Sequence, residues 1–302
     1  MIIPTTSYED IANKYTDAIS WMKSLGIQID KNRVVHYKKI IGYWASSYKT
    51  ASLEDGNRIF PDFLSSIFEV HDFIDIYFAF KDIPSNQLTK IIEKLQKSVN
   101  GPLNAIEEKP GTTSARNFLF EALLAARSHR PQRGISCILD AASDTGIKLE
   151  NKKIWIECKR ITSQNKLKKN ISDATKQLEN ILNKQVGSGH RGVVAIDISK
   201  VFTKGDQIMT RQDDVSLIDT IDEMMNGFIK QNHQIWESVY ERRSPKIIGT
   251  LIRFSFMASS ENRNLLVHAS QWGMNPKVTV SSSDENILRK LALNLKDSSR
   301  ED

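Results

Sequence analysis

The chain has 302 residues, of which 40% are hydrophobic, and its mean hydropathy is -0.38. These values predict a globular protein with room for two domains of ordinary size. No apolar run approaches the length of a membrane span, and the N-terminus lacks the basic start and apolar core of a signal peptide, so we expect a cytoplasmic protein without membrane association. The only two cysteines, Cys137 and Cys158, exclude a disulfide scaffold and a cysteine-rich zinc site.

The net charge of +6 is unevenly distributed along the chain. Up to Pro110 there are 13 basic and 14 acidic residues, whereas the remainder has 29 basic and 22 acidic residues. The densest segment is Lys152 to Lys176, with eight basic side chains and only two acidic ones. This excess predicts a polyanionic partner such as DNA or RNA, and a merely solvated basic helix face is the alternative.

The first part of the chain has apolar residues at helical spacing from Ser7 to about Asn100, which predicts an all-helical domain over residues 1–110. The segment NGPLNAIEEKPGTTS is rich in Gly, Pro and Thr, as linkers are, so we place a second domain at residues 111–302. Because the helical domain is near electroneutrality, we expect it to contact protein rather than nucleic acid. The protein would be a separate partner or a second copy of the chain in a homodimer.

The second part changes pattern. A helix is predicted over about 115–128, then short strands at ISCIL, TGIKL and KIWIECK, and then a helix with one apolar face over about 167–181. The run VVAIDI is typical of a strand buried on both sides. A long helix is predicted from about 215 to 240, followed by strands at IIGTLIRFSF and LLVHAS. This order predicts an α/β domain with a mixed central sheet flanked by helices.

The stretch IWIECKR, residues 154–160, has two ionisable side chains inside an apolar strand. Alternation places Glu157 and Lys159 on one face. If TGIKL and KIWIECK form a hairpin that turns over residues 150–153, Gly146 faces Glu157 and Asp144 faces Lys159. Gly146 then leaves open space beside Glu157, and the opposite, core face consists of apolar side chains: Ile147, Leu149, Ile154 and Ile156.

Two carboxylates and an ammonium group at one end of a hairpin could bind a metal ion and act on a water molecule. Carboxylate oxygens are ligands for Mg²⁺, with Mn²⁺ as a substitute, alongside a main-chain carbonyl and water. The lysine would orient or deprotonate a water that attacks a phosphate. The alternative is a buried salt bridge in which Lys159 only neutralises the carboxylates.

A strand with Glu-x-Lys, an aspartate 13 positions upstream and a basic helix downstream resembles the PD-(D/E)XK nuclease superfamily, which includes Mrr-type, RecB-type and Holliday-junction-resolving enzymes. The helix SARNFLFEALLAAR is similar to the first helix of that family, and Glu121 matches its inward glutamate. Glu121 also lies on an apolar stripe of this helix. Gln177 matches a glutamine of some RecB-like members, with an ordinary surface glutamine as the equal alternative.

The resemblance is incomplete at one position. The proline that often precedes the metal-binding aspartate is absent, since Ser143 precedes Asp144 and Leu139 precedes Asp140. Asp140 is therefore the second choice for the metal ligand. Glu-x-Lys occurs three times in the chain, but only Glu157 and Lys159 lie in an apolar strand opposite an aspartate.

The resemblance implies a restriction-endonuclease-like fold and a Mg²⁺-dependent nuclease, with DNA preferred over RNA and a role in defence against phage or plasmids. Asp144, Glu157 and the Cys158 carbonyl would hold the metal, Glu121 would assist it, and Lys159 would position the water. The residues expected to bind nucleic acid are Arg160, Lys166, Lys168, Lys169 and Gln177. Two other hypotheses are a catalytically inactive nuclease-fold module that only binds nucleic acid, and an interaction module for an acidic protein.

Overall fold

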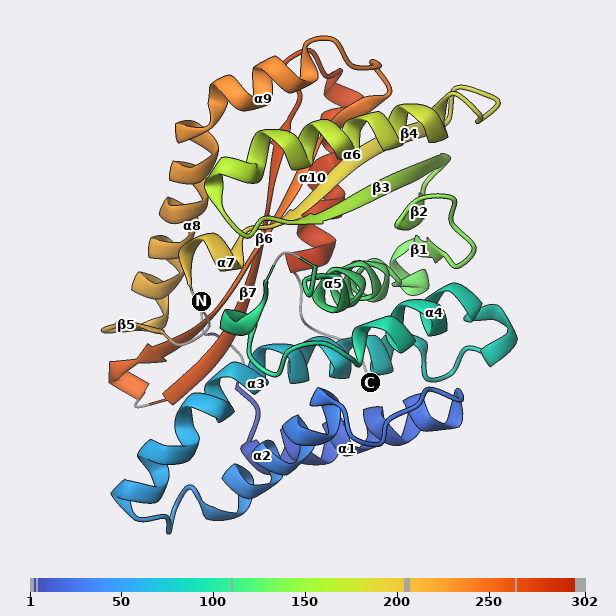
Figure 1. Cartoon of the computed structure of the whole chain (residues 1–302). Helices are drawn as coiled ribbons and strands as arrows, with labels where there is room; N and C mark the ends of the chain where they lie inside the picture. The colour runs from blue at the N-terminus through green and yellow to red at the C-terminus, as the bar shows by residue number, and fades with distance from the viewer. Residues whose placement is uncertain (1–2, 4, 110, 204–206, 264, 297–302) are drawn as a thin grey trace. The chain divides into compact units, whose positions relative to one another are not determined.

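The computed structural model describes residues 3, 5–109, 111–203, 207–263 and 265–296 (Figure 1). The chain forms two compact units. The first consists of Met1–Leu123, Thr203–Leu217 and Phe256–Ala269, and the second of Leu124–Phe202, Ile218–Ser255 and Ser270–Asp302. The predicted domain boundary between residues 110 and 111 says that the two parts fold independently, and this stays a prediction.

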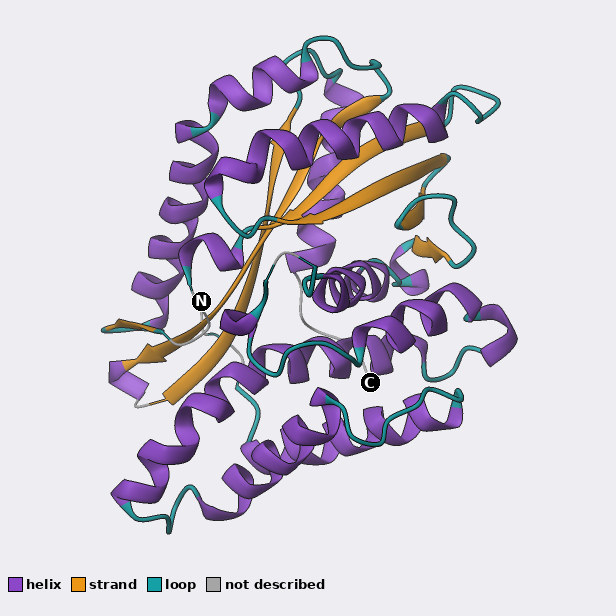
Figure 2. Cartoon of the chain, in the orientation of Figure 1, coloured by secondary structure: helices purple, strands orange, loops and turns teal. Residues whose placement is uncertain are grey.

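The first unit begins with the predicted run of helices, which Figure 2 shows in purple. Its elements are α1 Tyr8–Ser24, α2 Arg33–Ser47, α3 Leu53–Phe80, α4 Thr89–Ser98, the start of α5 Ser114–Arg127, and the short 3-10 helices Ser85–Gln87 and Ala105–Glu107. The Ser7 hydroxyl accepts a 3.0 Å hydrogen bond from the amide of Asp10, which caps α1. The prediction of a helical N-terminal region is therefore confirmed.

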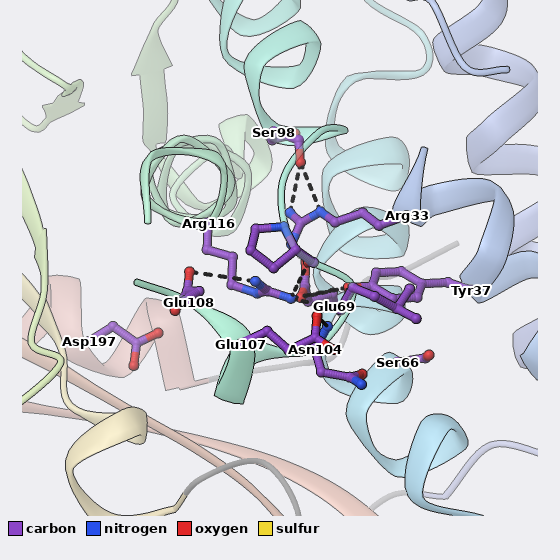
Figure 3. A network of polar contacts seen from close by, with 12 residues as sticks. Arg33, Tyr37, Ser66, Glu69, Ser98, Asn104, Glu107, Glu108, Arg116 and Asp197 are labelled. Atoms are coloured by element: carbon purple, nitrogen blue, oxygen red, sulfur yellow. Dashed lines mark hydrogen bonds and ion pairs between the residues drawn. The ribbon is translucent and has the colours of Figure 1, made fainter. Parts of the chain in front are cut away.

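A buried ionic network connects three of these helices (Figure 3). Glu69 of α3 lies 2.7 Å from the guanidinium of Arg33 on α2 and 2.6 Å from that of Arg116 on α5. The hydroxyl of Tyr37 lies 2.9 Å from Glu69 and 2.7 Å from the Leu103 carbonyl, and its single proton is shared between these two acceptors. Burial alone would raise the pKa of Glu69, but the two guanidinium groups and these hydrogen bonds lower it below its ordinary value. The network therefore holds a carboxylate ionised inside the first unit.

The central sheet is mixed, as predicted. The strand order is β1-β2-β3-β4-β6-β5, with β7 paired to β6. The β1/β2 and β2/β3 pairs are antiparallel, whereas β3/β4, β4/β6 and β5/β6 are parallel. The strands are β1 Ile135–Ile138, β2 Thr145–Leu149, β3 Lys152–Arg160, β4 His190–Asp197, β5 Ile208–Arg211, β6 Ile247–Ser260 and β7 Leu265–Pro276.

The remaining elements include the helices of the second unit, which are α6 Leu167–Leu182, α7 Ser199–Phe202, most of α8 Asp214–Gln231, α9 His233–Tyr240 and α10 Ser282–Lys296. Short 3-10 helices lie at Pro131–Arg133, Gln164–Lys166 and Glu261–Arg263. A Cβ built at Gly192 of β4 would lie 3.0 Å from Leu182 of α6. Gly192 is level with Trp155 of β3, so α6 covers the sheet face that Trp155 shares with Glu157.

The long helix predicted over about 215–240 is two helices, α8 and α9. The break is at Asn232, whose side-chain amide donates a 2.8 Å hydrogen bond to the carbonyl of Phe228. Asparagine competes with the helix for main-chain hydrogen bonds, which explains why the helix is interrupted there.

The β2–β3 hairpin has a different register from the predicted one. Thr145 pairs with Ile156 and Leu149 with Lys152, so β3 is shifted by two residues. The cause is the turn, which consists of Glu150 and Asn151, with Glu150 at a φ of 54°. A positive φ at the first turn residue is typical of two-residue hairpin loops. Because the shift is even, every side chain keeps its predicted face.

Two consequences follow for the hairpin faces. The predicted core face is confirmed, since its four apolar side chains are buried: Ile147, Leu149, Ile154 and Ile156. The expected open space at Gly146 is wrong. Gly146 is level with Trp155, and a Cβ built there would lie 2.9 Å from the Cβ of Ala141 and 3.1 Å from that of Ile138. The glycine instead allows close packing against Ala141 and Ile138.

Candidate functional site: an aspartate, a glutamate and a lysine on one hairpin

The hairpin brings Asp144, Glu157 and Lys159 together. Glu157 and Lys159 are two residues apart in β3 and therefore share a face. Asp144 immediately precedes β2, and the pairing of Thr145 with Ile156 places Asp144 level with Glu157. The predicted trio is thus adjacent in space, with Asp144 level with Glu157, two residues along β3 from its predicted position opposite Lys159.

The three charged groups lie within ion-pairing distance. The Lys159 ammonium is 3.7 Å from Glu157 Oε2 and 3.9 Å from Asp144 Oδ2. Glu157 is the most deeply placed, with a side chain 5% exposed, whereas those of Lys159 and Asp144 are 21% and 25% exposed. The trio therefore has one buried carboxyl group and two groups that solvent or a ligand can reach.

The protonation of Glu157 follows from this placement. Burial is the largest cause that raises its pKa, to about 8, and the neighbouring charge of Asp144 adds to the effect. Lys159 acts in the opposite direction but does not outweigh them. Near neutral pH the Glu157 carboxyl group consequently keeps its proton in the ion-free protein. A divalent cation between the carboxyl groups would favour the ionised form.

The Cys158 main chain faces the same edge as Asp144. The Lys153 amide donates at 2.9 Å to the carbonyl of Gly189, just before β4, and the amide of Ile161, just after β3, donates at 2.8 Å to Asp197 of β4. Odd-numbered residues of β3 therefore turn toward β4. Even-numbered residues turn toward β2, and the amide of Cys158 donates to Asp144 Oδ2 at 2.8 Å. The N–H and C=O groups of one strand residue point to the same edge. The Cys158 carbonyl is thus positioned on the edge that Asp144 occupies.

These groups fit a hard cation through two carboxylates and a main-chain oxygen. Among the residues that the structure describes, no group of three or more His, Cys, Asp or Glu side chains could hold a metal ion. A cation at the trio would therefore depend on Asp144, Glu157, the Cys158 carbonyl and water.

Glu121 lies on α5 and belongs to the first unit. Its side chain is buried and forms an ion pair with Lys94 of α4. The burial agrees with the apolar stripe that the sequence indicates, and its predicted role beside a metal stays a prediction. Lys94 is a partner that helical spacing alone could not identify, because the two residues come from different helices.

Three of the predicted phosphate-binding lysines, Lys166, Lys168 and Lys169, are exposed at the start of α6. The connection from β3 to α6 is short, so they lie at the end of the sheet where Lys159 is located. Gln177 is also exposed, outside the buried stripe of α6. The lysines form a basic rim near the trio.

Arg160 is half-buried and lies on the opposite face of β3 from Lys159, level with Asp197 of β4. Asp197 is buried, 3.2 Å from the guanidinium of Arg253 on β6, and it accepts a 2.8 Å hydrogen bond from the amide of Ser199. Sequence reasoning did not single out this pair. The available signal was an aspartate at the carboxyl end of the buried run VVAIDI, where functional side chains gather in parallel sheets.

Asp140, the second choice for the metal ligand, is exposed in the turn after β1. Asp144 is the aspartate with hydrogen-bonded contact to β3.

No protein-family model, curated protein or solved structure matches the chain. Within the described residues, no helix combines the length and the apolar character needed to span a membrane.

Proposed function

We propose that the chain is a metal-dependent nuclease of the PD-(D/E)XK type that hydrolyses phosphodiester bonds, with DNA as the preferred substrate. The observation that carries the proposal is the convergence of Asp144, Glu157 and Lys159 at the open end of the β2–β3 hairpin. Three antiparallel strands, a helix and a parallel fourth strand also support a restriction-endonuclease-like sheet. Cytoplasmic location and defence against phage or plasmids remain predictions.

Each group of the trio has a role in this proposal. Asp144, Glu157 and the Cys158 carbonyl would hold Mg²⁺, and the bound cation would supply positive charge beside the scissile phosphate. The Lys159 ammonium lies 3.7 Å from Glu157 Oε2 and 3.9 Å from Asp144 Oδ2. An ammonium group only donates hydrogen bonds, so Lys159 orients the attacking water and stabilises charge on the phosphate rather than removing a proton.

Substrate binding is assigned to the basic rim. Lys166, Lys168 and Lys169 are exposed and would contact phosphates that flank the cleaved bond. Such contacts position a strand without reading its sequence. Arg160 points to the other face of β3, so its predicted phosphate contact has less support than those of the three lysines.

The test is cleavage of plasmid DNA by the purified chain with Mg²⁺, with Mn²⁺ or with EDTA. We expect fragments only with a divalent cation, and none from a Glu157→Ala variant. Cleavage in EDTA, or full activity of Glu157→Ala, would refute the assignment. Asp75→Asn, which changes an acidic residue of the first unit, is a control for loss of one carboxylate elsewhere.

The second candidate is a nuclease-fold module that binds nucleic acid without cleaving it. It is favoured by the small number of side-chain ligands, because no three-residue metal cluster is found in the described part of the chain. Plasmid binding that weakens with salt, without cleavage at any concentration of Mg²⁺ or Mn²⁺, would select this candidate.

A further inference from the structure

The segment from Lys31 to Lys49 has five basic residues and no acidic residue. The rest of the first 110 residues has eight basic and 14 acidic residues. The near-neutral average of the helical region therefore conceals a strongly basic segment, which contains α2.

Folding separates this segment into an inner and an outer face. The buried residues of α2 are Arg33, Val34, Tyr37, Ile41 and Ala45. The charge of Arg33 is neutralised by Glu69, whereas the four lysines of the segment are exposed. Among the described residues, none of these lysines forms an ion pair: Lys31, Lys38, Lys39 and Lys49. Their charges remain available to an external anion.

Two aromatic rings accompany the lysines. Tyr43 is 43% exposed and lies one helical turn after Lys39, and Tyr48 is 39% exposed at the end of α2. Tyr48 packs edge-on against Tyr8 with ring centroids 4.9 Å apart, and the Lys49 ammonium lies 5.4 Å from its centroid. Within the described residues, the side chain of Tyr43 has no ring contact and no hydrogen-bond partner. Tyr43 is therefore a free stacking surface.

The helix surface beside Tyr43 is open. Gly42 precedes it, and no atom lies within 4 Å of the place that a Cβ of Gly42 would occupy. The glycine thus leaves the helix surface uncovered at this position, next to Tyr43 in the sequence.

We propose that the outer face of α2, defined by Lys31, Lys38, Lys39, Tyr43, Tyr48 and Lys49, binds single-stranded nucleic acid. The lysines neutralise phosphates, and Tyr43 stacks on an unpaired base. Stacking on an exposed ring requires a free base face, which a single strand offers and the interior of a duplex does not. The inference rests on the proposed nuclease function and extends it to the first unit. It differs from the expectation, drawn from the average charge, that the helical region contacts protein rather than nucleic acid.

The dimensions of α2 suit a short stretch of strand. At about 1.5 Å per residue its 15 residues extend over roughly 22 Å. This length matches a site of about four nucleotides, the lower end of the range for single-strand-binding modules.

The experiment is fluorescence anisotropy with labelled oligothymidylate and the full chain in EDTA, so that binding is measured without cleavage. The variants are made in a Lys166→Gln, Lys168→Gln, Lys169→Gln background, which removes the basic rim. Replacing Lys38, Lys39 and Lys49 with Gln should weaken binding more than tenfold at low salt. It should also flatten the salt dependence by about 2 log units per log unit of salt, roughly 0.7 for each phosphate contact. Tyr43→Ala should weaken binding by about five- to 150-fold, and Tyr43→Trp should restore it.

The matched control replaces Lys14, Lys23 and Lys90 with Gln, three exposed lysines of the same unit that lie outside α2. Equal weakening by this control would show a general charge effect and would overturn the site. Unchanged binding by the α2 variants would overturn it as well and leave an acidic protein as the partner to test. A chain that binds through α2 but cleaves nothing would contradict the nuclease proposal alone.

Discussion

The carboxylate of Asp144 is held by the main chain of β3, through the 2.8 Å hydrogen bond that it accepts from the amide of Cys158. This contact lies beyond the last residue pair of the β2–β3 ladder, Thr145 with Ile156. The position of Asp144 beside Glu157 is therefore set by backbone geometry and does not require the Lys159 ammonium.

Lys159→Met should strongly reduce the rate of cleavage while metal binding remains. The ammonium is the group assigned to the water and the phosphate, so we expect a loss of about 10²- to 10³-fold in rate, as for removal of a charge-stabilising donor. Calorimetry with Mn²⁺ should give an affinity within a few-fold of that of the unmodified chain. Loss of Mn²⁺ binding would instead show that Lys159 organises the carboxylates.

Asp144→Asn should abolish both Mn²⁺ binding and cleavage, because it removes one of two carboxylates at the site. Nucleic-acid binding should persist, since the basic rim and α2 are unchanged. Asp140→Asn is the matched control on the neighbouring turn, and it should retain activity because Asp140 is exposed. If the two variants behave in the opposite way, the aspartate is misassigned even though a nuclease assignment stands.

Glu157→Gln should stabilise the ion-free protein at high pH. Burial and Asp144 raise the pKa of Glu157 from 4.5 to about 8, so between these values the folded chain binds a proton that the unfolded chain releases. The contribution of Glu157 to the free energy of unfolding has its full size below about pH 4.5, the pKa in the unfolded chain, and is lost as pH rises through about 8, the pKa in the folded chain. Glutamine does not titrate, so the variant does not lose this contribution. Near pH 9 we expect its free energy of unfolding to exceed that of the unmodified chain by an amount on the order of 2 kcal/mol.

Urea unfolding in EDTA at about pH 9 and pH 4 measures the difference in free energy of unfolding between Glu157→Gln and the unmodified chain. This difference should vanish at the lower pH. Mn²⁺ should reduce it, because a cation favours the ionised carboxylate of the unmodified chain. A gain that is equal at both pH values would point to packing rather than to protonation.

Glu69→Ala should destabilise the chain by about 3–5 kcal/mol, because the buried guanidinium of Arg33 loses its counter-ion and that of Arg116 keeps only Glu108, at 3.5 Å. Denaturant unfolding followed by circular dichroism would measure the change. Glu93→Gln breaks the exposed pair with Lys90 at 3.7 Å and serves as control, with an expected change below about 1 kcal/mol. Similar effects of both substitutions would mean that the network is not a buried ionic unit.

Gly146→Ala should cost about 1–3 kcal/mol, since the new methyl group would meet the Cβ atoms of Ala141 and Ile138 at 2.9 and 3.1 Å. Gly42→Ala makes the same chemical change in α2, where no atom lies within 4 Å. It should stabilise the chain by about 0.5–1 kcal/mol, as expected for alanine in a helix interior. In thermal unfolding, Gly146→Ala should lower the melting temperature and Gly42→Ala should raise it. A stabilising effect of Gly146→Ala would contradict the close packing at this glycine.

The local sequence pattern was sufficient to predict most helices and strands of the second unit and the three residues of the candidate trio. Period-two alternation placed Glu157 and Lys159 on one face, and an even shift in register left Asp144 on that face too. Alternation cannot locate the turn itself, because it does not distinguish registers that differ by two residues. The left-handed backbone of Glu150, a residue without the freedom of glycine, was the unpredictable feature.

Long-range partners were beyond local pattern. The pairs Lys94 with Glu121 and Asp197 with Arg253 join residues from different elements, and no spacing rule connects them. Averaging the charge over 110 residues likewise concealed the basic outer face of α2. The break at Asn232 was missed because the apolar periodicity continues across it.

The two-residue turn at Glu150 and Asn151 also limits how this chain can vary in length. An insertion or deletion of one residue that changes the β2–β3 register by one would turn one strand over relative to the other and move one carboxylate to the far face. The segment between β1 and Asp144 lies outside the ladder, so a length change there does not turn a strand over. A register change of one residue in this hairpin should therefore separate the two carboxylates, whereas a length change before Asp144 should leave them on one face.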